Sequence, residues 1–199
     1  VTHVAGACVP ARTPGRADSR RRAYGDFAGA DDFLFLTAGD ALSGAHRKNP
    51  LGAVRAFLAA FPGDDHVRLA VKTHSLDKVV LPDDLAVWEA IRDVCAEDPR
   101  VRLIDELLDE PAHRALIAGA DCLVSLHRAE GLGYHVLEAM AAGVPVVATD
   151  YSGTADFCTP ETAFLVPGRL VPVDPRRYPN AGVEQRWAEP DPDEAAAAL

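Results

Sequence analysis

Two glutamates with seven residues between them flank a glycine-containing turn. Glu130 precedes Gly131-Leu132-Gly133, and Glu138 follows in the expected helix. A bare glycine backbone lets a ligand approach closely, and the unpaired amides and dipole of a helix start favour a phosphate. Carboxylates accept hydrogen bonds from vicinal sugar hydroxyls. The stretch therefore indicates a ligand that carries both phosphate and hydroxyl groups.

Each of these features also has a purely structural explanation. A Gly-x-Gly turn is a weak signal by itself, because the glycines can simply satisfy positive backbone angles. One glutamate could be a surface residue and the other a favourable charge at a helix start. Glu138, however, lies on a helix that is otherwise apolar. Burying an unpaired carboxylate is costly, so Glu138 must face a cleft or have a partner.

Two cations, Arg47 and Lys48, lie just before a helix that is expected to start at Asn49-Pro50. Cations oppose the helix dipole at that place, so a structural reason for them is weak. Guanidinium and ammonium groups are natural partners for a diphosphate. No metal-ligand cluster is evident, and Asp191-Pro192-Asp193 is better explained as a helix N-cap than as a metal-binding Asp-x-Asp string. We therefore expect a diphosphate site without a metal or other cofactor.

The composition limits the class of protein. The chain has 199 residues, of which 48% are hydrophobic, and a net charge of −10. A sizeable core is therefore expected, and a nucleic-acid partner is not. No apolar run approaches the ~20 residues of a membrane span. The four cysteines form no Cys-x-x-Cys pair, which indicates a reducing compartment. The chain starts at Val1 and ends in an alanine run, so we interpret it as a piece of a longer protein.

Buried strands and amphipathic helices alternate along the chain. Apolar runs predict strands over 33–37, 67–71, 101–104, 122–126, 146–148 and 164–166. Helical patterns cover 50–61, 83–97, 111–118 and the segment between Gly133 and Gly143. Residues 1–30 are expected to be a solvated linker, residues 31–199 one domain, and 167–190 an irregular segment. The alternation predicts an α/β fold with a Rossmann-like, doubly wound parallel sheet, whose ligand lies at the carboxyl ends of the strands.

The combined motifs resemble those of retaining GT-B glycosyltransferases, specifically glycosyltransferase family 4. Glu130 and Glu138 match the Glu-x7-Glu motif, and the residues from Glu138 to Thr149 resemble its usual continuation. Tyr151 to Phe157 resemble the next turn of the family. Segments 47–50, 125–128 and 187–191 resemble a subgroup associated with cell-surface polysaccharide synthesis. The resemblance runs from about residue 32 to the end of the chain.

The resemblance implies a single C-terminal lobe of a GT-B fold, which binds a nucleotide-diphosphate sugar. Glu138 would hold the ribose. The catalytic residues would be Glu130, which would contact the transferred sugar, and Lys48 with Arg47, which would neutralise the diphosphate. The acceptor, a glycan or a lipid-linked sugar, would bind a further domain upstream. The resemblance also implies a bacterial, cytoplasmic enzyme, with peripheral membrane attachment of the full-length protein left open. The expected donor-binding residues are Glu138, Gly131, Leu132, Gly133, Tyr134 and His127.

The chain departs from the family pattern at two places. Ser43 and Gly44 stand where the family more often has an arginine, a role that Arg47 would take over. Leu132 replaces a usual phenylalanine. Two other functions stay open, a GT-B nucleotide-sugar epimerase and a non-catalytic nucleotide-sugar-binding module. A nicotinamide oxidoreductase is disfavoured, because the loop after the first strand lacks the Gly-x-Gly-x-x-Gly fingerprint.

Overall fold

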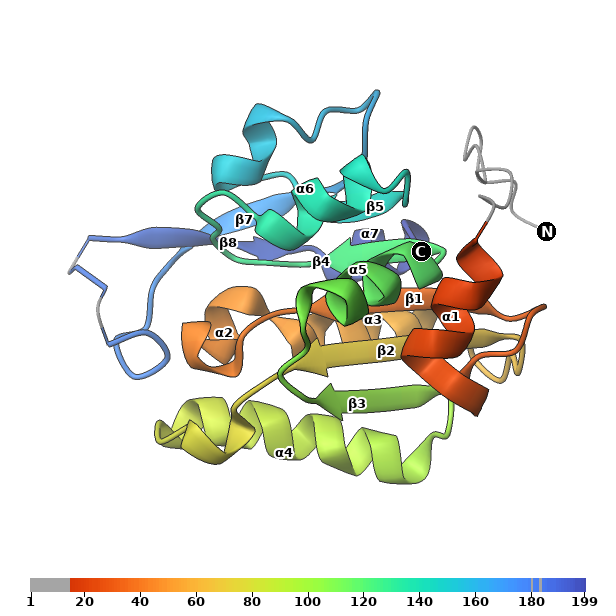
Figure 1. The fold of residues 1–199 in the computed structure, drawn as a ribbon. Coiled ribbons are helices and arrows are strands. Elements are labelled where there is room, and N and C mark those ends of the chain that lie inside the picture. Colours follow the sequence, from red (N-terminus) through yellow and green to blue (C-terminus); the bar gives the residue numbers. More distant parts are fainter. Residues whose placement is uncertain (1–14, 180, 183) are drawn as a thin grey trace.

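The computed structural model describes residues 15–179, 181–182 and 184–199. At its centre lies a six-stranded parallel sheet with the strand order β3-β2-β1-β4-β5-β6 (Figure 1). All six predicted strands are present, which confirms the expected α/β class. Their bounds are β1 (Phe33–Ala38), β2 (Val67–Thr73), β3 (Val101–Asp105), β4 (Cys122–Ser125), β5 (Val146–Thr149) and β6 (Phe164–Val166).

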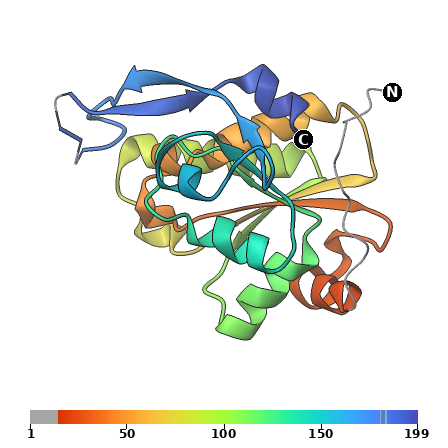
Figure 2. The ribbon, with the colours of Figure 1, turned by 90° about the horizontal axis from the view of Figure 1, so that it is seen from above.

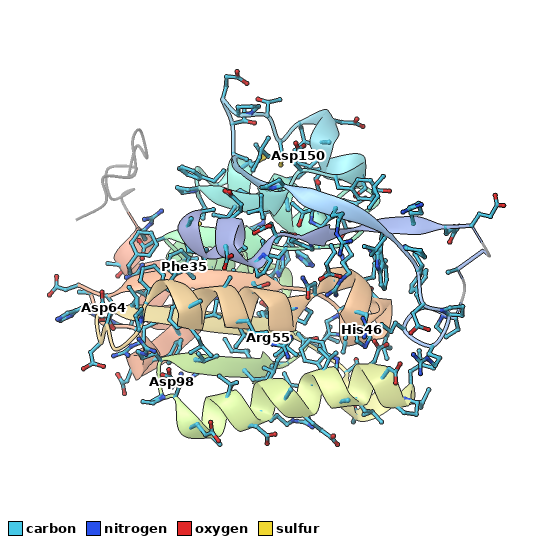
Figure 3. All side chains as sticks on the ribbon, turned by 180° about the vertical axis from the view of Figure 1, so that it is seen from behind. Phe35, His46, Arg55, Asp64, Asp98 and Asp150 are labelled. Atoms are coloured by element: carbon cyan, nitrogen blue, oxygen red, sulfur yellow. The ribbon has the colours of Figure 1, made fainter. Side chains whose placement is uncertain are left out.

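Helices cover both faces of the sheet (Figure 2). One face carries α3 (Pro50–Ala60), α4 (Pro82–Glu97) and α7 (Pro192–Ala197), and the other carries α1 (Arg16–Tyr24), α5 (Glu110–Gly119) and α6 (Tyr134–Ala141). Successive side chains of a strand point to opposite faces. Phe35 therefore packs into the core under α3, as Figure 3 shows from behind, while Leu34 and Leu36 pack into the core under α5 and α6.

The strand order reverses direction between β1 and β4. From β1 the chain proceeds outward through β2 and β3, and from β4 it proceeds outward on the other side through β5 and β6. The two central strands pair through Phe35 beside Cys122 and Leu36 beside Leu123. In sheets of this kind the ligand crevice lies outside the carboxyl ends of the two strands at the reversal. The segments that follow β1 and β4 therefore flank the candidate site.

The solvated linker predicted for residues 1–30 is wrong for the described part of that range, whereas residues 1–14 lie outside the described residues. Helix α1 and the 3-10 turn η1 (Gly25–Phe27) pack against α5. Arg20 donates from Nε to Gly119 O at 3.0 Å and also pairs with Asp121. Tyr24 donates its hydroxyl to Leu116 O at 2.7 Å. These buried partners explain why an arginine-rich sequence folds onto the domain instead of staying in solvent.

The predicted irregular segment 167–190 contains an antiparallel hairpin of β7 (Gly168–Pro172) and β8 (Arg186–Pro190). This corrects the sequence prediction for the two ends of the segment. The hairpin is attached beside the sheet through the loop after β4. Ala188 N donates to Arg128 O at 2.9 Å, and the Arg128 guanidinium forms a two-point ion pair with Glu189 at 2.6 and 2.7 Å. These contacts with β8 fix the position of the loop after β4.

The segment after β1 is more ordered than expected. It forms the 3-10 turn η2 (Ala41–Ser43) and the short helix α2 (Ala45–Lys48), so Arg47 and Lys48 lie in a helical turn and not in a loop. Asn49 has a left-handed backbone with φ of 56° and makes no side-chain cap. Its side chain instead donates from Nδ2 to Leu126 O at 2.8 Å. The remaining 3-10 turns are η3 (Leu76–Lys78) and η4 (Ser152–Asp156).

Within the described residues, no helix has both the length and the apolar character needed to cross a membrane.

Candidate functional site

The cations that follow β1 meet the first glutamate that follows β4. Lys48 donates from Nζ to Glu130 Oε2, and Arg47 Nη1 lies 3.5 Å from Glu130 Oε1. Arg47 also donates to Ala129 O at 2.8 Å and to Ser43 O at 3.1 Å. The three residues predicted to be catalytic are therefore neighbours, at the place where the strand order reverses.

The Glu130 carboxylate stays ionised although its surroundings are partly buried. Burial raises the pKa of Glu130, but the hydrogen bond and charge of Lys48, together with the charge of Arg47, outweigh it and lower the pKa overall. The side chains of Lys48 and Glu130 are only 17% and 11% exposed, so solvent screens their charges weakly. An ammonium group has three donors. Lys48 can therefore hold Glu130 and still donate to a bound anion.

The glycine turn lies directly against the 3-10 turn η4. Gly153 N donates to Glu130 O at 3.1 Å, and Glu130 N donates to Ser152 Oγ at 2.8 Å. A Cβ atom on Gly153 would lie 1.5 Å from Gly131 O, and one on Gly133 would lie 2.6 Å from Thr154 Cγ2. Both glycines are therefore required for this close approach. The motif resemblance included residues 151–157 but implied no role for them.

Gly133 also sets the start of α6. Its φ of 72° is in the left-handed region, which suits a glycine, and it is the residue that precedes Tyr134 at the helix start. Gly131 is exposed, and so are Leu132 at 48% and Tyr134 at 69%. The turn is thus exposed except at Gly133, which is buried. Their roles in donor binding stay predictions.

His127, which was predicted to contact the donor, is fully buried. Its Nδ1 lies 3.0 Å from Ser125 Oγ, and its Nε2 lies 3.0 Å from Thr154 Oγ1 and 3.2 Å from Tyr151 O. Burial lowers the pKa of His127, so the ring is neutral at pH 7. The His127 side chain thus links the end of β4 to η4 and its preceding residue Tyr151, and its role in donor binding stays a prediction.

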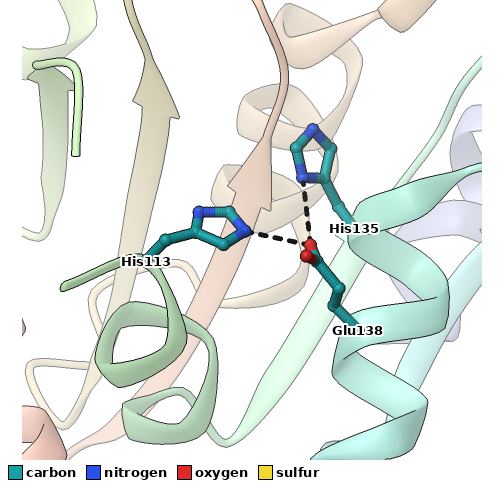
Figure 4. Close-up of side chains that lie close together, drawn as sticks. All are labelled: His113, His135 and Glu138. Carbon is teal, nitrogen blue, oxygen red and sulfur yellow. Dashed lines mark hydrogen bonds and ion pairs between the residues drawn. The ribbon is translucent and has the colours of Figure 1, made fainter. Parts of the chain in front are cut away.

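Glu138 projects from α6 beside two histidines (Figure 4). His113 Nε2 of α5 lies 2.9 Å from Glu138 Oε2, and His135 Nδ1 lies 3.9 Å from the same oxygen. The Glu138 side chain is 45% exposed. Of the two expectations for this carboxylate, a cleft or a partner, the structure confirms the partner, which is His113. His113 was missed because it lies on another helix and belongs to no motif.

Of the two histidines beside Glu138, His135 is neutral at pH 7. Burial first, and then the charges of Lys48 and His113, lower the pKa of His135 to about 4. His113, His135 and Glu138 form a group of potential metal ligands whose ligand atoms lie within 4.8 Å of one another. No metal was expected from the sequence, because no motif joins His113 to His135 and Glu138.

One further sequence prediction concerns a residue outside this cluster. Asp191 accepts hydrogen bonds from the backbone amides of Asp193 and Glu194 at 3.0 and 3.1 Å, which confirms it as the N-cap of α7.

Comparison with known families decides the class of this domain. A family model described as "Glycosyl transferases group 1" matches residues 65–181, which is more than half of the chain. The chain belongs to this family. The matched range includes Glu130, Glu138 and the glycine turn, whereas Arg47 and Lys48 precede it. No curated protein matches the sequence. The resemblance to a polysaccharide-synthesis subgroup stays a prediction.

Solved structures share the fold of this group 1 domain at low sequence identity. An Escherichia coli trehalose-6-phosphate structure bound with UDP-2-fluoro glucose matches with a TM-score of 0.61, 15% identity and coverage of 92% of this chain and 41% of that one. An α,α-trehalose-phosphate synthase (UDP-forming) from Burkholderia xenovorans, in complex with glucose-6-phosphate, matches with a TM-score of 0.62, 13% identity and coverage of 92% and 41%.

HepE from Anabaena, in complex with UDP and glucose, matches with a TM-score of 0.59 and 19% identity. That match covers 78% of this chain and 39% of HepE. The chain thus spans about two-fifths of the length of these structures. Its six-stranded sheet and covering helices correspond to one lobe of a GT-B fold.

Proposed function

We propose that this group 1 domain binds the donor of a retaining hexosyltransferase, a nucleotide-diphosphate sugar. The proposal rests on one observation above all. Lys48 and Arg47, which follow β1, converge on Glu130, which follows β4, at the reversal of strand order. Two structures with the same fold, from Escherichia coli and Anabaena, contain a uridine diphosphate ligand according to their descriptions. Their likeness supports the fold, and the chemistry of the site supports the ligand.

The diphosphate would lie between α2 and the glycine turn. Lys48 and Arg47 offer two cations from one side, and the amides of Leu132 and Gly133 offer donors and a helix start from the other. The Gly131 amide donates to Glu130 Oε1 at 3.0 Å and would join them once it exchanges this partner for the diphosphate. Transfer breaks the bond between the anomeric carbon of the sugar and the diphosphate oxygen. Negative charge then accumulates on the diphosphate, and the two cations stabilise it without a metal ion.

The two glutamates would hold the two sugars of the donor. Glu130 is fixed by Lys48 and by the backbone of η4, so its carboxylate can contact hydroxyls of the transferred hexose and stabilise positive charge at the anomeric carbon. Glu138 is more exposed and lies on the first turns of α6, so it would accept hydrogen bonds from the ribose hydroxyls. The buried His127, between Ser125 of β4 and Thr154 of η4, would position the glycine turn.

The acceptor side of the reaction belongs to the larger enzyme. The structures with the same fold are about twice as long as this chain, and the matches cover about two-fifths of each. We propose that a second domain binds a glycan or a lipid-linked acceptor and closes over the glycine turn. A bacterial polysaccharide-synthesis pathway and a cytoplasmic site, with peripheral attachment to a membrane, follow from the motif resemblance and form part of the proposal.

Calorimetric titration with UDP, GDP and their sugars tests the donor site. We expect one nucleotide to bind, and Lys48→Ala to weaken its affinity by ~10–100-fold, because a charge-assisted hydrogen bond contributes about 1.5–3 kcal/mol. Glu138→Ala should weaken the same nucleotide through its ribose. Lys78→Ala, which removes an exposed lysine of η3, is the matched control and should leave binding unchanged. Equal binding by the Lys48 and Lys78 variants would refute the proposed site.

A further inference from the structure

We propose that His113, His135 and Glu138 form a binding site for one divalent transition-metal ion such as Zn²⁺. The ligand atoms of the three side chains all lie within 4.8 Å of one another (Figure 4). Two imidazoles and one carboxylate are a ligand set that zinc uses in proteins, with the fourth position open. Nothing in the glycosyl transfer proposed above uses these two histidines.

The spacing of the ligand atoms suits a tetrahedral ion. Bonds of about 2.0–2.1 Å to zinc place neighbouring ligand atoms about 3.3 Å apart. Glu138 Oε2 lies 2.9 Å from His113 Nε2 and 3.9 Å from His135 Nδ1, so the two distances bracket that value. Small rotations of the partly exposed His113 and Glu138 side chains would equalise them.

The fold already brings the ligands together. His135 and Glu138 are three residues apart on α6, so they share one face of the helix. His113 comes from the first turns of α5, which packs on the same face of the sheet. His135 Nδ1 is buried and has no hydrogen-bond partner among the described residues, because Glu138 is too far away at 3.9 Å. A metal ion between the two groups would satisfy this nitrogen.

An ion in this site would compete with the donor. This step rests on the proposed function, in which Glu138 accepts hydrogen bonds from the ribose. A carboxylate oxygen that is bound to zinc cannot at the same time be free to accept these bonds. Zinc at His113, His135 and Glu138 would therefore lower the affinity for the nucleotide, and the nucleotide would lower the affinity for zinc by the same factor.

Titration with Zn²⁺ alone, by calorimetry in a non-chelating buffer, tests the metal site. We expect one ion per chain, with His113→Ala and Glu138→Gln weakening its affinity by at least ~tenfold. His66→Ala is the matched control. His66 is an exposed histidine beside Asp32, outside the proposed site, so its removal should leave Zn²⁺ affinity unchanged. Co²⁺ should give the strong visible absorption of a four-coordinate ion, and Mg²⁺, which prefers oxygen ligands, should not bind. Absence of Zn²⁺ binding, or equal binding by the His113 and His66 variants, would overturn the site.

Titration with UDP in the presence of Zn²⁺ tests the competition. UDP affinity should fall as Zn²⁺ is added to the unaltered chain and should fall less in His113→Ala, a comparison that corrects for chelation of Zn²⁺ by UDP in solution. An equal fall in both proteins would refute the sharing of Glu138. If the unaltered chain bound Zn²⁺ with the expected dependence on His113 but bound no nucleotide at all, the metal site would stand and the proposed donor site would fail.

Discussion

Lys48 and Glu130 form a partly buried ion pair. This pair is sensitive to pH, because protonation of the Glu130 carboxylate removes its negative charge. Because the pKa of Glu130 is lowered from its ordinary value of 4.5 in the folded protein, its ionised form stabilises the fold. That stability is complete above the unfolded pKa and is lost as the pH falls through the lower, folded pKa. The carboxylate therefore contributes to structure as well as to the proposed chemistry.

Glu130→Gln should lower the free energy of unfolding at pH 7 by ~1–3 kcal/mol, since it removes a charged hydrogen-bond partner from two cations. The difference from the unaltered protein should shrink as the pH is lowered below 4.5. Urea unfolding at a series of pH values measures it. Glu97→Gln, at the exposed end of α4, serves as the control. A difference that stays constant down to the lowest pH would contradict the assigned ion pair.

Sequence patterns predicted the neighbouring positions of Glu130, Lys48 and Arg47, because all three follow strands whose carboxyl ends meet at one edge of the sheet. They could not show that His127 is buried. A histidine after a strand has the same pattern whether its ring faces a ligand or packs beneath the loop. They also missed His113, because the contact with Glu138 joins two helices, and only the packing of α5 beside α6 creates it.

The position of the glycine turn depends on its contact with η4. Gly153→Ala would place a Cβ atom 1.5 Å from Gly131 O and force the two segments apart. We expect a loss of ~1–3 kcal/mol in stability, as for other overpacking substitutions. UDP affinity should fall at least ~tenfold, because a shift of about 1 Å in a site can cost up to ~100-fold.

Calorimetry and chemical unfolding of the Gly153 variant measure both effects. Gly131→Ala is the control for stability, because a Cβ atom at that position meets nothing within 4 Å. Unchanged unfolding of Gly153→Ala would show that η4 and the glycine turn are not in the close contact described here.

Two buried arginines, Arg16 and Arg20, attach helix α1 to the domain through ion pairs with Asp121. Arg20→Ala would leave Asp121 with a single arginine partner and would leave Gly119 O and Asp32 O without their donor. We expect a loss of about 3 kcal/mol or more, as for other broken buried pairs. Arg22→Ala, on the exposed side of the same helix, should change stability by less than ~0.5 kcal/mol. Thermal unfolding of the two variants compares them, and equal melting temperatures would contradict the role of α1.

The strands and the long helices were predictable because their apolar periodicity reports burial directly. Helix α1 was not, because its sequence, RADSRRRAY, has no apolar stripe. Its stability comes from Asp121 and from backbone carbonyls far away in the sequence. The β7–β8 hairpin was missed for a similar reason. Its attachment is the pair of Arg128 with Glu189 and the ladder between β7 and β8, which no local pattern reveals.

The whole domain has the fold of one GT-B lobe. Residues 65–181 match the group 1 glycosyl transferases, and the chain covers about two-fifths of each solved structure with the same fold. The open edge formed by the glycine turn, α2 and α6 is the face on which a second lobe would close. Donor binding is therefore the step of the proposed reaction that can be measured on this chain by itself.

A crystal structure of this chain with UDP tests the central claim most directly. We predict the diphosphate within hydrogen-bond distance of Lys48 Nζ and of the amides of Gly131 to Gly133, with the ribose hydroxyls at Glu138. UDP bound at any other place on the domain, with Lys48 still paired only to Glu130 and the glycine turn empty, would contradict it.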